Sequence, residues 1–241
     1  MKAGIAVRDI TPSPEQWDFA RLGRAGAVLH RIPKGVDEPL LARALVLEEN
    51  ETRAALVACD LIAVTREMSE RLEAAAARLG IAREGLVLHG THSHSGPDVR
   101  GQFPEQRDYA RWAADRCAAA VEEALASAVE VRVAAGAGAE AEIAQNSRVL
   151  LADETVGWVA FAPEETVGPT GPIDPRVGHV SFLAVGDQQS PVGKPLVATL
   201  VNYSLHSTLR PEAGTGGYWP GYPGQTCMEV ERRLEIGRAH V

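Results

Sequence analysis

The chain has 241 residues, of which 45% are hydrophobic and only 5% aromatic. This balance is typical of a globular protein with a core of Ala, Val and Leu. The formal net charge is −8, and lysine and arginine are spread singly, which argues against nucleic acid or an anionic membrane surface as the main partner.

The first half of the chain predicts alternating strands and helices. A strand at 5–10 is stopped by two prolines, and two further apolar runs flank Asn50, which marks a β-hairpin turn. Thr65 is suited to cap a helix that ends near Gly80, because apolar residues recur at helical spacing between them. The remaining expected elements of this half are strands at 40–47, 54–59, 86–88 and 129–133 and a helix at 109–125.

The second half predicts short strands separated by Gly, Pro and Asp turns, at 156–161, 177–185 and 196–203. An amphipathic helix is expected to begin at 229–234. The run from Gly136 to Gly138 lacks the third glycine and the following helix of a dinucleotide-binding site, so it is interpreted as a turn. The fold class is therefore α/β, with mixed β-sheets flanked by helices and a β-rich second half, in a single domain.

Targeting and redox signals favour a cytoplasmic protein. The chain enters an apolar alternation at 3–7, almost directly after Met1, without the features of a secretory signal. No run approaches the roughly 18 apolar residues of a membrane span. Cys59, Cys117 and Cys227 are far apart and odd in number, so we expect reduced core residues and not a disulfide framework.

The stretch 86–97 is the most informative part of the chain. Its aliphatic start predicts a buried central strand, and Ser-Gly-Pro ends it, so His92 and His94 fall where strand becomes loop. Side chains two apart on an extended backbone share a side, which directs both imidazoles into one space. His206 also follows an apolar strand. Together these histidines suggest part of a catalytic zinc site.

Alternative interpretations of nearby residues stay open. His30, His89 and His179 fit hydrogen-bonded structural histidines. Asp60 either orients a ligand histidine or caps its own strand. A Ser/His hydrolase is a competing chemistry, because several serines lie beside histidines, but the Gly-x-Ser-x-Gly elbow is missing.

Four segments of the chain resemble the N-terminal catalytic domain of neutral/alkaline, non-lysosomal ceramidases. They occur in the family's order with approximately its spacing, from Gly4 to about Tyr222, and the block from Thr91 to Pro97 is the most specific. The segments are Gly4-Ile5-Ala6-Val7-Arg8-Asp9-Ile10-Thr11-Pro12, the stretch 37–47 with Arg43, Gly90-Thr91-His92-Ser93-His94-Ser95-Gly96-Pro97, and Asn202-Tyr203-Ser204-Leu205-His206.

The resemblance implies a zinc amidase that hydrolyses the N-acyl bond of a lipid or small-molecule substrate, which is ceramide in the characterised members. By motif, His92 and His206 match two zinc ligands and His94 lines the site beside the metal. Arg148, in the turn Asn146-Ser147-Arg148, matches an arginine near the substrate.

Some features depart from the family. Tyr218-Trp219-Pro220-Gly221 lacks the Asp that usually precedes Tyr-Pro-Gly. The family's remaining zinc ligands, a Glu and a Tyr, and its catalytic serine would lie beyond Leu234. The ending 235–241 matches the translation of a sequencing-adapter read-through, which leaves 1–234 as an incomplete zinc hydrolase domain. We therefore expect weak zinc binding, exposed apolar surface, a tendency to aggregate, and an inactive fragment.

Two other functions fit the sequence. A relative acting on a non-lipid amide or ester agrees with the missing secretion signal and anchoring helix. The other is a non-catalytic metal- or ligand-binding module, which would be favoured if the intact gene lacked a C-terminal half with the Glu and Tyr ligands. The oligomeric state is not predicted.

Overall fold

The computed structural model describes residues 1–25, 31–158, 163–186, 195–208 and 216–234. His30 and the segment 235–241 lie outside the described residues, so the interpretations given to them stay predictions. The chain forms two compact units, one with residues 1–134, 180–200 and 206 onward and the other with residues 135–179 and 201–205. Three of the four boundaries between the units, at 134/135, 179/180 and 200/201, fall inside strands, in keeping with the expected single domain.

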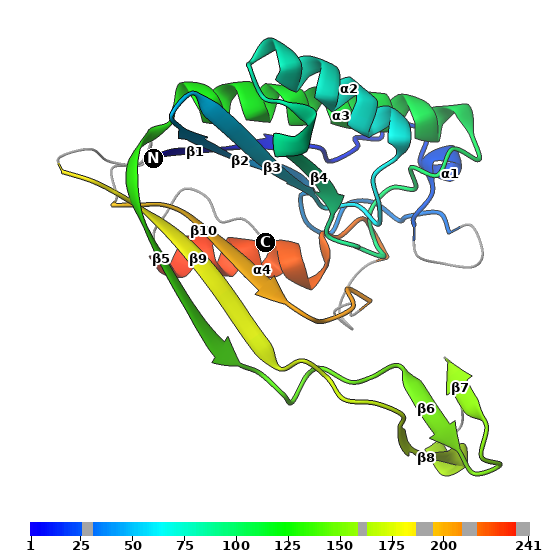
Figure 1. Cartoon of the computed structure of the whole chain (residues 1–241). Coiled ribbons are helices and arrows are strands. Elements are labelled where there is room, and N and C mark those ends of the chain that lie inside the picture. The colour runs from blue at the N-terminus through cyan, green and yellow to red at the C-terminus, as the bar shows by residue number, and fades with distance from the viewer. Residues whose placement is uncertain (26–30, 159–162, 187–194, 209–215, 235–241) are drawn as a thin grey trace. The chain divides into compact units, whose positions relative to one another are not determined.

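A seven-stranded mixed sheet has the strand order β10-β9-β5-β1-β2-β3-β4 (Figure 1). Strands β1, β2 and β3 pair antiparallel, whereas β4 joins β3 in parallel. This arrangement confirms the expected α/β class with mixed sheets. The strands are β1 Lys2–Asp9, β2 Leu41–Glu49, β3 Thr52–Cys59, β4 Leu86–Gly90, β5 Val129–Ala139, β9 Arg176–Ala184 and β10 Leu196–Tyr203.

The hairpin between β2 and β3 has a two-residue turn. Glu49 pairs with Thr52, and the intervening Asn50 and Glu51 have φ values of 48° and 68°. Positive φ at both central residues matches the right-handed twist of the flanking strands. The hairpin predicted around Asn50 is confirmed.

Helices α2 Arg66–Arg78 and α3 Pro104–Ala126 pack on one face of the sheet (Figure 1). The Thr65 hydroxyl accepts a hydrogen bond from the Met68 N–H at 3.2 Å, as expected of an N-cap. The largest apolar cluster joins these helices to β2 and β3, with Leu72 and Val57 fully buried. Both predicted helices are confirmed. A short helix, α1 Phe19–Leu22, precedes the hairpin.

The opposite face of the sheet has a smaller apolar cluster that includes Ile5, Leu45 and Phe182. Helix α4 Gly221–Leu234 meets this face at Arg43, whose Nε lies 3.9 Å from Glu231 Oε1. The helix expected to begin at 229–234 therefore begins earlier, at Gly221.

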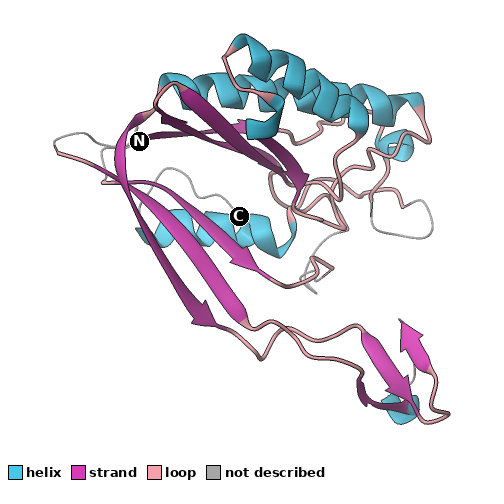
Figure 2. Ribbon diagram, viewed as in Figure 1, coloured by secondary structure: helices cyan, strands magenta, loops and turns pink. Residues whose placement is uncertain are grey.

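The second unit contains a three-stranded antiparallel sheet, β7-β6-β8 (Figure 2). Its strands are β6 Arg148–Leu151, β7 Val156–Trp158 and β8 Thr166–Pro169. The sequence pattern missed β6 and β8, which are only four residues long. The turn predicted at Gly136 to Gly138 is wrong, because these residues lie within β5, where Gly136 faces the His179 ring.

Candidate metal centre

The loop that carries His92 and His94 follows the edge strand of the large sheet. Strand β4 is last in the strand order and Val87 is 50% exposed. The expectation of a buried central strand is therefore wrong: parallel pairing with β3 places β4 at the edge of the described sheet. The Thr91 N–H donates to the Cys59 carbonyl at 2.8 Å, so the loop starts against the end of β3.

The backbone of His92 is left-handed, with a φ of 64°, which is uncommon outside glycine. Alternation along an extended strand is therefore the wrong reason for His92 and His94 to meet, and a turn brings their rings together. His92 Nδ1 lies 2.8 Å from the Ile62 carbonyl oxygen. Because a carbonyl only accepts, Nδ1 carries the proton and the Nε2 lone pair of a neutral ring is available.

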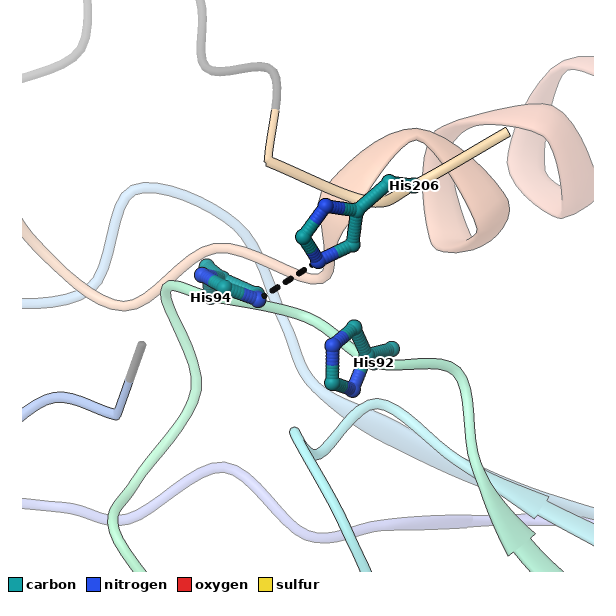
Figure 3. A group of neighbouring side chains, drawn as sticks. All are labelled: His92, His94 and His206. Carbon is teal, nitrogen blue, oxygen red and sulfur yellow. Dashed lines mark hydrogen bonds between the residues drawn. The ribbon is translucent and has the colours of Figure 1, made fainter. Parts of the chain in front are cut away.

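His206, three residues after β10, brings a third ring to the same place (Figure 3). The ring centroids of His92, His94 and His206 lie 4.8 to 4.9 Å apart. The Nε2 atoms of His94 and His206 are 3.1 Å apart, although 112 positions separate the residues. One nitrogen of each ring lies within 4.8 Å of the other two, so the three could hold a metal ion.

The donor set suits zinc. Imidazole nitrogens bind zinc at about 2.0–2.1 Å in tetrahedral geometry, which places two ligand nitrogens about 3.3 Å apart. The Nε2 atoms of His94 and His206 lie 3.1 Å apart, which fits two ligands of one zinc ion and equally fits a hydrogen bond between the rings. This pair differs from His92 and His206, the pair that the resemblance implies as zinc ligands. Burial lowers the pKa of His206, and the neighbouring His92 lowers it further.

Arg148 begins β6 in the second unit. The Asn146 side-chain oxygen accepts the Arg148 N–H at 2.9 Å, and this bond shapes the expected turn. The guanidinium carbon lies 4.7 Å from the centroid of the Trp158 ring, within cation–π range. Its role near a substrate stays a prediction.

Two solved structures are similar to this chain. Neutral ceramidase from Pseudomonas aeruginosa gives a TM-score of 0.70 at 20% identity, covering 99% of this chain and 37% of that chain. A ceramidase complexed with C2 gives 0.71 at 22% identity, covering 99% and 36%. The chain has the fold of neutral ceramidase. No protein-family model and no curated protein matches the sequence.

The chain spans little more than a third of the length of these two ceramidases. In this ceramidase fold the three histidines belong to one compact unit, while Arg148 belongs to the other. His89 and His179 are not members of the cluster found among the described residues. The ligand and catalytic roles assigned by resemblance stay predictions.

Asp60 contacts the start of the neighbouring strand β2. Its Oδ2 accepts the Leu41 N–H at 2.9 Å and an Arg43 N–H at 3.1 Å. Burial raises the pKa of Asp60 by more than the Arg43 charge lowers it. Asp60 therefore caps the start of β2, where the sequence suggested a cap of its own strand or the orientation of a ligand histidine.

Sequence reasoning missed the structural use of the serines beside the histidines. In this chain Ser93 is fully buried, and its hydroxyl donates to the Trp219 carbonyl at 2.8 Å. Ser207 is 3% exposed. Because the Ser93 hydroxyl is engaged by backbone, it is not placed as the nucleophile of a Ser/His pair. The sequence did contain a signal for this structural role, because a serine directly follows each of the three histidines.

Proposed function

We propose that this chain carries part of the metal site of a zinc-dependent amidohydrolase of the neutral ceramidase type. The proposed reaction is cleavage of the N-acyl amide bond of ceramide or another acyl amide. The observation that supports it is the convergence of His92, His94 and His206 from distant segments. The fold shared with neutral ceramidase adds support.

His92 and His206 would hold the ion, His92 through Nε2 because Nδ1 is engaged by Ile62. A bound zinc supplies a Lewis acid for the amide carbonyl and lowers the pKa of water to about 7. His94, beside His206, is assigned to pass a proton or to stabilise the developing oxyanion, and Arg148 shares the second task.

We also propose that this chain by itself is inactive. No carboxylate joins the three imidazoles within the described part of the chain, so water would complete the coordination of zinc. His92 and His206 are also exposed, which leaves the site without the water-excluding surroundings that strengthen electrostatic catalysis. We therefore expect modest zinc affinity and no turnover.

The substrate is proposed to be a lipid or small-molecule acyl amide. None of the described helices is long and apolar enough to cross a bilayer. Selection of the substrate by acyl-chain length or head group is to be measured directly, with a ceramide in mixed micelles beside a water-soluble N-acyl amide.

The first experiment is a zinc titration of the metal-free chain against a chelating dye. His92→Ala and His206→Ala are each expected to weaken binding by about tenfold or more, because each removes one of few protein ligands. His179→Gln is the matched control, since His179 lies outside the cluster. Equal zinc affinity in the His92→Ala, His179→Gln and unaltered chains would overturn the site.

The second experiment measures fatty acid released from both N-acyl substrates. Fatty acid release that is lost in His92→Ala would support the proposed hydrolase but would contradict the proposal that this chain by itself is inactive. Zinc binding without turnover, here and in a ceramidase-length protein that contains this sequence, would favour the non-catalytic metal-binding module.

A further inference from the structure

Residues 219–221, here called the bridging segment, contact the loop that carries His92 and His94. The Ser93 hydroxyl donates to the Trp219 carbonyl at 2.8 Å, and the Trp219 N–H donates to the Ser95 carbonyl at 3.0 Å. Ser93 also accepts the Ser95 N–H at 3.2 Å. The side chain between the two histidines is therefore tied to the bridging segment.

The same segment meets the residue next to His206. Gly221 has a φ of 79°, and a Cβ placed on it would lie 2.4 Å from the Ser207 hydroxyl oxygen and 3.5 Å from the Ser93 Cβ. Contacts below 3.0 Å are not seen for real Cβ atoms. A larger residue here would have to displace the Ser207 hydroxyl and would also be strained by the positive φ of Gly221, so glycine suits the place where the bridging segment passes between Ser93 and Ser207.

The bridging segment is itself anchored. The Tyr218 N–H donates to the Gly35 carbonyl and the Asp37 N–H to the Tyr218 carbonyl, both at 2.8 Å. Tyr218 is fully buried, and α4 begins at Gly221. The bridging segment is therefore held in place at both ends, so it can fix the positions of the two histidine-bearing loops that contact it.

We infer that Ser93 and Gly221 are positioning residues that set the separation between His206 and the pair His92 and His94. The inference rests on the proposed function, because a fixed separation matters most when the three rings share one ion. Partners that orient ligands affect metal affinity strongly, typically by 10–100-fold.

The first test replaces Ser93 by alanine and measures zinc affinity and urea unfolding of the whole chain. We expect affinity to fall by about tenfold. Ser127→Ala is the matched control, because the Ser127 hydroxyl also donates to a backbone carbonyl, that of Ala124 at 3.2 Å, at the end of α3. Its zinc affinity should stay unchanged. A fall in Ser93→Ala no larger than in Ser127→Ala would overturn the inference.

The second test asks whether the Gly221 contact acts through Ser207. Gly221→Ala should weaken zinc binding, because its Cβ displaces the Ser207 hydroxyl beside His206. Gly221→Ala with Ser207→Gly removes the clash but keeps the strain of alanine at positive φ, so it should recover part of the affinity, which a general loss of stability would not do. A double variant that binds zinc no better than Gly221→Ala would contradict the mechanism.

A metal-free measurement separates failure of this inference from failure of the proposed function. Hydrogen exchange of the apo chain should be faster at 91–96 and at 204–208 in Ser93→Ala than in Ser127→Ala. If the unaltered chain binds no zinc, the proposed function fails, and exchange alone decides the inference. Unchanged exchange in both segments would overturn it.

Discussion

Arg43 and Asp60 form an ion pair in which both side chains are almost fully buried, with 2% and 0% exposed. Burial lowers the pKa of Arg43, but nearby acidic groups, Asp60 first among them, raise it by more. Burying each charge costs free energy of desolvation, and the attraction between the two charges offsets this cost. If one partner is removed, the other stays buried without that attraction. The stability of the protein should therefore be sensitive to the loss of either partner of this pair.

Replacing Arg43 by methionine should lower the free energy of unfolding by about 3–5 kcal/mol, since it leaves Asp60 buried and unpaired. Adding Asp60→Asn should recover part of the loss, because no buried charge then remains and the Leu41 N–H keeps an acceptor. Urea unfolding measures both. Glu229→Gln, in an exposed ion pair with Arg232, is the control and should change little. An unaltered midpoint in Arg43→Met would contradict the prediction.

At the residue scale the sequence indicated which histidines meet but not how. The motif around His92 and the strand before His206 were visible as patterns. The left-handed backbone of His92 and the hydrogen bond from Ser93 to Trp219 depend on contacts between distant segments. Periodicity describes only local backbone geometry, so it cannot contain them.

At the scale of elements, the approach of α3 to β1 depends on a glycine. A Cβ on Gly4 would lie 1.9 Å from the carbonyl oxygen of Ala124, a backbone atom of α3. Backbone cannot give way as a flexible side chain does, so α3 would have to move off the sheet. Gly138 in β5 offers a contrast, because nothing lies within 4 Å of its Cβ position.

Gly4→Ala should therefore destabilise the chain by about 1–3 kcal/mol through overpacking. Gly138→Ala should be neutral or slightly stabilising, since alanine loses less conformational freedom than glycine on folding. Thermal and urea unfolding of the two variants, compared with the unaltered chain, measure the difference. Equal stability of both variants would show that α3 packs less closely against β1 than the structure indicates.

The elements that the sequence predicted well are those whose own residues specify them. Helix α2 has its cap at Thr65 and apolar residues at helical spacing, and the β2–β3 hairpin has Asn50 in its turn. Strands β6 and β8 are too short to show alternation, and the glycines of β5 imitate a turn. Their pairing partners define them, and pairing is not a local property.

At the scale of the whole molecule, one face of the three-stranded sheet exposes apolar side chains. Leu150 pairs with Val156 and Arg148 with Trp158, so the four share a face. Val156 and Trp158 are each 60% exposed and Leu150 is 36% exposed. Exposed apolar surface of this kind favours association. The tendency to aggregate that the sequence implies stays a prediction.

Val156→Lys should therefore reduce self-association of the chain, because it replaces one of the three exposed apolar side chains of this face by a charge without removing a buried contact. Sedimentation velocity over a concentration series measures the self-association. Val167→Lys is the control, because Val167 is similarly exposed, at 66%, but lies on β8 and is not one of the four. The unaltered chain and Val167→Lys should associate more with rising concentration, and Val156→Lys less. If all three sediment as monomers throughout, this exposed face does not drive association. The tendency to aggregate would then have to come from other parts of the chain.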